Sequence, residues 1–437
     1  MIINKPNIQF QGMAAKIKTN YPIVILINFI FFESGLVASV IGAIIPDIIV
    51  TYKLGYGIAS ILLFSYFIAY GVVAIPAGWL GEKTSVKTVI LLALAVGFLG
   101  TFLFALFPVY AIALISLFLI GCCLAAAQVN LMPLLRVAVG GENLAFYTLF
   151  MTLLFGLGSF ISPHIYSYFV NNLYVNETNS NFILHFFEGQ LSPETKWVAV
   201  YWVSSAALLL TLIVISFIRF PNIKLEENEK TGTRSSYIQL LKDKKVILFF
   251  LAIFFYVFCE QGAANWISQF LKTYHDVPPQ TTGAFTLSYY WILLTVGCSL
   301  GMFLVKFFDS RRIMSVAASM ALVALFTALC GGRDTSIVAF ALIGLFISVL
   351  WPISMELAFN SIDYHHGSFS GILFTGTIGG AIGPLFIGTI GDYFGLRFGM
   401  MLLAIPLFYL LFISFWTKPI VKNKIIKGKA KIFLSTN

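Results

Sequence analysis

Charged side chains are scarce in this sequence. Only 10% of the 437 residues are Asp, Glu, Lys or Arg, while 59% are hydrophobic. Soluble domains carry about 25% charged residues. This chain therefore has too few charged side chains to cover the surface of a soluble protein of 437 residues. We therefore expect a membrane protein rather than two or three soluble domains.

Residue patterns typical of metal centres, disulfide frameworks and nucleotide hydrolysis are also missing. The five cysteines lie in or beside apolar runs, with the spacing of neither a zinc site nor an external disulfide set. The sequence contains no Gly-x-x-x-x-Gly-Lys-Ser/Thr phosphate loop and no nucleophile–base arrangement around its histidines. We expect neither enzyme activity nor a metal, and no cofactor.

Long apolar runs are what the sequence has in abundance. A helix that crosses a bilayer needs about 20 mostly apolar residues. Twelve such runs can be counted, at 21–50, 57–81, 87–107, 108–136, 145–171, 197–219, 245–271, 281–307, 313–331, 336–361, 368–390 and 395–417. The sequence therefore predicts an all-α membrane protein with twelve transmembrane helices.

One long connection, rich in Lys and Glu, divides the runs into six and six. We accordingly expect two six-helix bundles joined by a linker, with a tail at each end. The predicted units are an N-terminal tail 1–20, a bundle 21–219, a linker 220–244, a second bundle 245–417 and a basic tail 418–437.

Basic residues predict the orientation. If the helices alternate in direction, 22 of the 27 Lys and Arg residues fall on the side of the two termini and 5 on the other. The positive-inside rule then places both termini in the cytoplasm, as in a multi-pass protein of a bacterial inner membrane. The net charge of +9 is better explained by anionic lipid than by nucleic acid.

A short polar turn occurs twice, at matching places in the two predicted bundles. Each copy has a glycine, an apolar spacer, an acid and then bases, between two apolar runs. The copies contain Gly78, Glu82, Lys83 and Lys87, and Gly301, Asp309, Arg311 and Arg312. Such repetition is typical of a duplicated transporter. These residues are candidates for gating, with the stronger contact in the C-terminal copy, although solvated loop charges are the alternative.

The repeated turns resemble the signature loop of the major facilitator superfamily, and further segments are similar to its fucose permease branch. These segments are Gln128–Asn130, Phe255–Glu260, Gly344–Pro352 and Gly379–Arg397. The resemblance implies the major facilitator fold, alternating access and transport of a sugar with protons. Two carboxylates of that branch are replaced, because Gly42 and Gln128 stand at the matching positions. The identity of the substrate therefore does not carry over.

Three acids lie well inside apolar runs: Glu33, Glu260 and Glu356. An ionised carboxylate costs several kcal/mol in hydrocarbon, so each must face protein, water or a partner. Glu260 and then Glu33 are the candidates for proton coupling, with structural hydrogen bonding as the alternative. For Glu356 we expect pairing with Arg136 or Arg311, and we include Glu356 and Arg136 among the gating residues.

Polar and aromatic residues on the same predicted helices are candidates for binding the substrate, with helix packing as the alternative for the aromatic ones. They are Gln128, Asn130, Gln261, Asn265, Trp266, Tyr290 and Trp351.

The favoured function is a secondary active transporter, working as a monomer, that imports a small polar solute such as a sugar with protons. A proton-driven exporter of drugs, siderophores or metabolites is the alternative. A non-transporting receptor on the same fold also stays open.

Overall fold

The structure of the protein is a computed structural model that describes residues 19–139, 144–174, 181–220, 234–362, 364 and 366–418. Within these residues it is nearly all helical, and twelve segments are long and apolar enough to cross a membrane. The prediction of twelve spans is thereby confirmed. Nearly all of the two predicted tails, and residues 221–233 of the predicted linker, lie outside the described residues.

The N-terminal half contains six spans and a short extra helix. Its elements are α1 (Tyr21–Tyr52), α2 (Tyr56–Lys83), α3 (Val86–Leu106), α4 (Tyr110–Val139), α5 (Leu144–Asn172), the short α6 (Phe182–Gln190), the 3-10 turn Lys196–Val198 and α7 (Ala199–Phe217).

The C-terminal half follows a short helix, α8 (Arg234–Leu241), and several of its spans are broken. Its elements are α9 (Lys244–His275), the π turn Pro279–Gly283, α10 (Ala284–Leu304), α11 (Ser310–Cys330), α12 (Arg333–Ile347), α13 (Leu350–Phe359), α14 (His366–Thr375), the 3-10 turn Gly376–Ile378, α15 (Gly379–Phe394), α16 (Leu396–Met401) and α17 (Ala404–Trp416).

Helix starts coincide with capping residues that the sequence places between the apolar runs. The side chains of Asn20, Ser85, Asp243 and Asp309 accept hydrogen bonds from amides in the first turns of α1, α3, α9 and α11. An Asn, Ser or Asp at this position satisfies an amide that has no partner within the helix. At these four helices the capped starts agree with the predicted apolar runs within a few residues.

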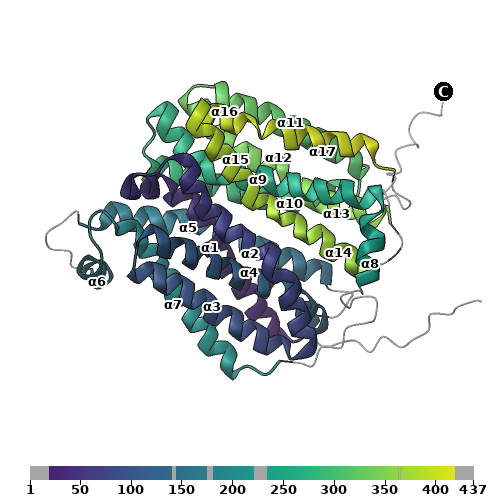
Figure 1. The fold of residues 1–437 in the computed structure, drawn as a ribbon, viewed down its shortest axis with the longest axis horizontal. Helices are drawn as coiled ribbons and strands as arrows, with labels where there is room; N and C mark the ends of the chain where they lie inside the picture. Colours follow the sequence, from purple (N-terminus) through teal and green to yellow (C-terminus); the bar gives the residue numbers. More distant parts are fainter. Residues whose placement is uncertain are drawn as a thin grey trace, which may run out of the picture.

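The two halves lie side by side, with α1–α7 in purple to teal and α9–α17 in green to yellow in Figure 1. They meet through α2 against α15, α5 against α10 and α1 against α9. Because the chain makes an even number of crossings, its described ends lie at one end of the bundle, which we call the tail end. The opposite end, where α6 lies, is the far end (Figure 1).

Helix breaks in the C-terminal half were not predicted. The eleventh span is interrupted by the 3-10 turn Gly376–Ile378, after which Gly379 packs on the backbone of Phe254. The tenth span is interrupted at Ser348, whose hydroxyl bonds the Leu345 carbonyl at 2.6 Å. Hydrophobicity continues through both breaks, so an apolar run alone does not reveal them.

Candidate functional site

Glu260 lies at the centre of a hydrogen-bonded cluster in the C-terminal half. It is half-buried on α9, and its Oε1 accepts a hydrogen bond from Tyr256 Oη at 2.7 Å. Its Oε2 accepts one from Gln261 Nε2 at 3.2 Å, while Tyr290 Oη donates to the Glu260 carbonyl at 2.9 Å. Tyr256 reaches the carboxylate because residues four apart share a helix face. Both carboxylate oxygens are therefore partnered, as a carboxylate in a membrane helix requires.

Two more predicted residues belong to this cluster. Asn265 Nδ2 donates to the Gln261 carbonyl at 2.8 Å and to Gln261 Oε1 at 3.3 Å. The Trp351 ring lies 5.6 Å from the Tyr256 ring, centre to centre. The structure thus brings Glu260, Gln261, Asn265, Tyr290 and Trp351 together, with Tyr256 as a member that we did not predict. The sequence did contain a signal for Tyr256, because it lies one helical turn before Glu260 and so on the same helix face.

The cluster lies next to the point where the two halves touch. A Cβ atom on Gly42 of α1 would lie 2.7 Å from the Ala264 carbonyl oxygen and 3.1 Å from a Leu287 methyl. Ala264 is one helical turn from Glu260, toward the far end. Glu260 and Gln261 are half-buried and lie on the tail side of this contact.

Trp266 lies elsewhere on α9. It is fully enclosed in this conformation, donates through Nε1 to the Pro384 carbonyl at 3.2 Å and packs edge-on against Tyr56 at 5.6 Å. Here it joins α9 to α15 and α2, and its ring faces are covered by protein.

The two polar candidates on α4 have different surroundings. Asn130 is buried and donates through Nδ2 to the carbonyl of Ala77 on α2, at 3.2 Å, and to that of Ala126, at 2.9 Å. Gln128 is half-buried and is a side-chain hydrogen-bond partner of Tyr70 on α2. Asn130 therefore fastens two helices together, while Gln128 remains partly accessible.

Glu33 is separate from the Glu260 cluster. It is 2% exposed, and its Oε1 accepts a hydrogen bond from Thr211 of α7 at 2.6 Å. Its Oε2 has no hydrogen-bond partner among the described residues. The two acids proposed for proton coupling thus lie in different environments, one enclosed within the N-terminal half and one beside the contact between halves.

The predicted gating residues of the first copy make contacts inside the N-terminal half. Lys87 Nζ donates to the Ser216 carbonyl at 2.8 Å, and Lys83 Nζ lies 3.9 Å from the centre of the Trp79 ring. A Cβ on Gly78 would lie 3.2 Å from Val129, so α2 and α4 approach closely there. The side chain of Glu82 lies outside the described residues.

The second copy contains an ion pair. Arg311 binds Asp309 at 3.2 Å and donates to the Thr417 carbonyl at 3.4 Å. Glu356 accepts a hydrogen bond from Ser310 Oγ at 2.8 Å, so its observed partner is this serine and not Arg311, which we had considered.

Three more gating candidates have simple placements. Gly301 packs on Val349, Arg312 lies in the first turn of α11, and Arg136 lies in the last turn of α4.

Two acids at the far end join the halves, and we did not predict them. Asp47 of α1 accepts hydrogen bonds from Tyr166 Oη at 2.5 Å and from Gln280 Nε2 of the C-terminal half at 2.8 Å. Asp392 of α15 accepts from the amides at the start of α2. Both acids lie at the ends of apolar runs, where a charged residue looks like an ordinary helix terminus.

Comparison with known proteins gives related transporters. The glucose/galactose transporter of Brucella abortus is 25% identical over 424 residues, spanning 92% of this chain and 98% of the relative. The L-fucose-proton symporter of Escherichia coli is 23% identical over 342 residues, spanning 75% of this chain and 77% of the relative.

Solved structures share the fold. The Escherichia coli fucose:proton symporter superposes with a TM-score of 0.64 at 18% identity, covering 90% of this chain and 98% of that one. A bacterial homologue of the human lysosomal transporter Spinster, inward-facing and occupied, gives 0.76 at 14% identity, covering 91% and 96%. The family model described as Major Facilitator Superfamily matches residues 27–384. With two six-helix bundles and a match over most of its length, the chain belongs to the Major Facilitator Superfamily.

Proposed function

We propose that the protein is a secondary active transporter that imports a hexose-like sugar together with protons by alternating access. The names of its relatives support this substrate class, since they include a glucose/galactose transporter and an L-fucose-proton symporter. The observation that carries the proposal is Glu260, a half-buried carboxylate next to the contact between the halves, with a tyrosine and an amide as partners.

Glu260 is suited to couple a proton to a sugar. Burial of a carboxylate disfavours its charged form, so a proton taken up there makes the loaded transporter easier to close. A sugar hydroxyl can both donate and accept, and it can replace Gln261 or Tyr256 as a partner of the carboxylate. Gln261, Asn265, Tyr290 and Trp351 then contribute to the sugar site from one half. Gln128 contributes from the other.

The contacts between the halves support a state closed at the far end. Asp47 and Asp392 link the halves there, and Gly42 packs against α9 deeper in the bundle. At the tail-end turns, the Arg311–Asp309 ion pair and the hydrogen bonds of Lys87 and Glu356 lie within single halves. We place the basic tail end in the cytoplasm of a bacterial inner membrane, so a monomer that is closed at the far end is in an inward-facing state.

Proton-driven uptake and counterflow in proteoliposomes test Glu260. We expect Glu260→Gln to abolish accumulation of galactose driven by a pH gradient while preserving exchange at equal pH on both sides. Glu260→Asp keeps an ionisable group and should retain part of the accumulation, and the exposed Asp334→Asn serves as the control. Wild-type accumulation by Glu260→Gln would exclude Glu260 as the coupling residue.

A proton-driven exporter of apolar compounds is the second candidate. An apolar groove of about 490 Å³ in the tail-end part of α1 and α5, lined by Ile25, Phe29, Phe32 and Phe150 among others, favours it. Disruption of the gene distinguishes the two, because loss of an exporter raises sensitivity to its ligand, whereas loss of an importer removes sugar uptake.

A further inference from the structure

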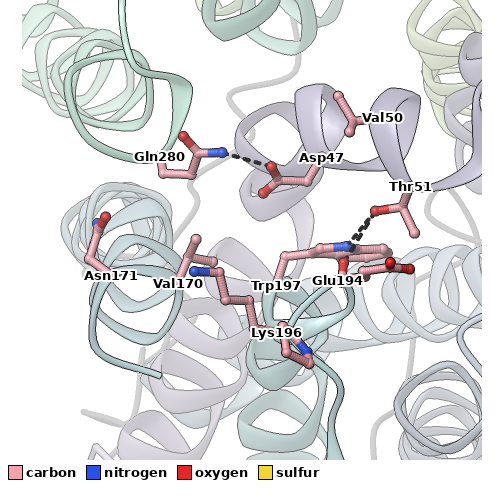
Figure 2. A pocket seen from close by; sticks show the side chains of 10 residues that line it. Asp47, Val50, Thr51, Val170, Asn171, Glu194, Lys196, Trp197 and Gln280 are labelled. Atoms are coloured by element: carbon pink, nitrogen blue, oxygen red, sulfur yellow. Dashed lines mark hydrogen bonds between the residues drawn. The ribbon is translucent and has the colours of Figure 1, made fainter. Parts of the chain in front are cut away.

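A polar pocket lies at the far end, apart from the Glu260 cluster. Its volume is about 430 Å³, within the range of small-molecule sites, and both halves line it. Figure 2 shows Gln280 of the C-terminal half beside Asp47 of α1, with side chains of α5 and of the segment before α7 around the rest of the pocket. The 15 residues of α9 between Glu260 and its end at His275 span about 22 Å, so this pocket is not part of the Glu260 cluster.

Asp47 is the residue through which this pocket joins the halves. Its Oδ2 is held by Tyr166, in its own half, at 2.5 Å. Its Oδ1 is held by Gln280, in the other half, at 2.8 Å, and this hydrogen bond crosses the top of the pocket in Figure 2. A ligand that takes over Oδ1 would leave Asp47 in place while releasing Gln280.

The opposite wall is braced within the N-terminal half. Trp197 Nε1 donates to Thr51 Oγ1 at 3.1 Å, and Thr51 donates to the Glu194 carbonyl at 3.3 Å. The Lys196 side chain extends along the pocket below Asp47 and acts electrostatically on its carboxylate (Figure 2). The pocket therefore offers a fixed wall, an acceptor and a cationic donor.

These groups are suited to a neutral solute with several hydroxyls. A hydroxyl can donate to the Asp47 carboxylate while another accepts from the Lys196 ammonium. Replacing the Gln280 amide by a hydroxyl exchanges one hydrogen bond for another, so the exchange itself is nearly balanced in free energy. The affinity of the solute therefore comes from its other contacts, such as the hydrogen bond from Lys196.

We propose that this pocket is an outer recognition site for a small polyhydroxylated solute, which displaces Gln280 from Asp47 and so loosens the closed far end. The proposal extends the proposed function, since the solute would be the sugar that is then imported. Linkage makes the effect reciprocal: solute bound in the pocket favours opening, and opening raises affinity for the solute.

Binding of labelled D-galactose to the purified full-length protein tests the site by equilibrium dialysis. In the Glu260→Gln background, where exchange and hence central binding are preserved, the outer site is measured as a second bound galactose per protein. We expect Lys196→Ala or Asp47→Asn to weaken this second binding step about tenfold or more. Lys272→Ala is the matched control, because Lys272 also acts electrostatically on Asp47 but does not line the pocket. Absence of a second bound galactose, or a second binding step that both pocket variants leave unchanged, overturns the proposal.

Opening of the far end is a second, independent readout. Spin labels on Val109→Cys and Thr335→Cys, both exposed and on different halves, report the separation of the far ends. The exposed Cys330 is replaced by Ser. Saturating galactose should lengthen this distance in Glu260→Gln but not when Lys196→Ala is added. Equal lengthening with and without Lys196, or none in Glu260→Gln, contradicts the proposal.

The two proposals fail in different ways. If wild-type protein does not accumulate galactose under a pH gradient, the proposed function fails. Lys196-dependent binding of galactose and lengthening at the far end would still support the outer site.

Discussion

Asp392 caps the start of α2 from the opposite half of the molecule. Its Oδ1 accepts a hydrogen bond from the Tyr56 amide at 2.7 Å, and its Oδ2 accepts one from the Gly57 amide at 2.8 Å. Helix α2 thus receives from α15 the acceptor that most helices obtain from their own N-cap residue. The negative charge also lies at the positive end of the α2 dipole. When the far end is closed, Asp392 therefore supplies hydrogen-bond acceptors to the first amides of α2.

Asp392→Ala should favour the state that is open at the far end. Loss of an N-cap acceptor costs about 1 kcal/mol, which changes the ratio of closed to open protein about fivefold. Spin labels on Val109→Cys and Thr335→Cys measure this change as a larger fraction of molecules in which the two labels are far apart. Asp334→Asn, in the first turn of α12 at the same end, is the control and should leave the distribution unchanged. An unchanged distribution for Asp392→Ala would show that the cap does not bias closure.

Gly42→Val should prevent closure of the halves near Glu260. Even the first added carbon would lie 2.7 Å from the Ala264 carbonyl oxygen, and backbone on a packed helix cannot move aside as a flexible side chain can. We expect uptake to fall at least tenfold while the melting temperature of the purified protein changes by only a few degrees. Gly332→Val is the control, since a Cβ there meets nothing within 4 Å in the described part of the chain. Normal uptake by Gly42→Val would contradict this contact.

Tyr256→Phe should weaken coupling without abolishing it. The variant removes one hydrogen bond to the Glu260 carboxylate, and such bonds to charged groups contribute about 1.5–3 kcal/mol. Gln261 still holds the other oxygen, so we expect reduced accumulation with exchange preserved. Tyr409→Phe is the matched control, because it removes a tyrosine hydrogen bond to the Leu248 carbonyl, away from Glu260. An equal loss in both variants would mean that Tyr256 acts through stability alone.

The sequence was informative about features that depend on local composition. Apolar runs predicted the spans, and the rarity of acids inside them singled out Glu260. It was less informative where a role depends on a neighbour distant in the chain. Trp266 is enclosed because Tyr56 and Pro384 pack against it, and Asn130 is occupied because α2 presents the Ala77 carbonyl.

The far-end contacts show the same dependence on distant partners. Asp47 and Gln280 are 233 residues apart, and Asp392 and Tyr56 are 336 apart. Each acid alone looks like an ordinary charge at a helix end. Only the packing of the two halves reveals that these carboxylates join them.

Glu33→Gln should reduce accumulation less than Glu260→Gln. Glu33 is enclosed within the N-terminal half at 2% exposure, so solute and water between the halves have poor access to it. Glutamine keeps an oxygen to accept the Thr211 hydrogen bond and removes a charge that burial disfavours, so we expect little change in melting temperature. Thr211→Val removes the same hydrogen bond and leaves Glu33 Oε1 without that donor, so it should lower the melting temperature more than Glu33→Gln does.

Uptake driven by a pH gradient, measured beside exchange, distinguishes a coupling role of Glu33 from a structural one. Loss of accumulation as complete as in Glu260→Gln, with exchange intact, would instead make Glu33 a coupling residue.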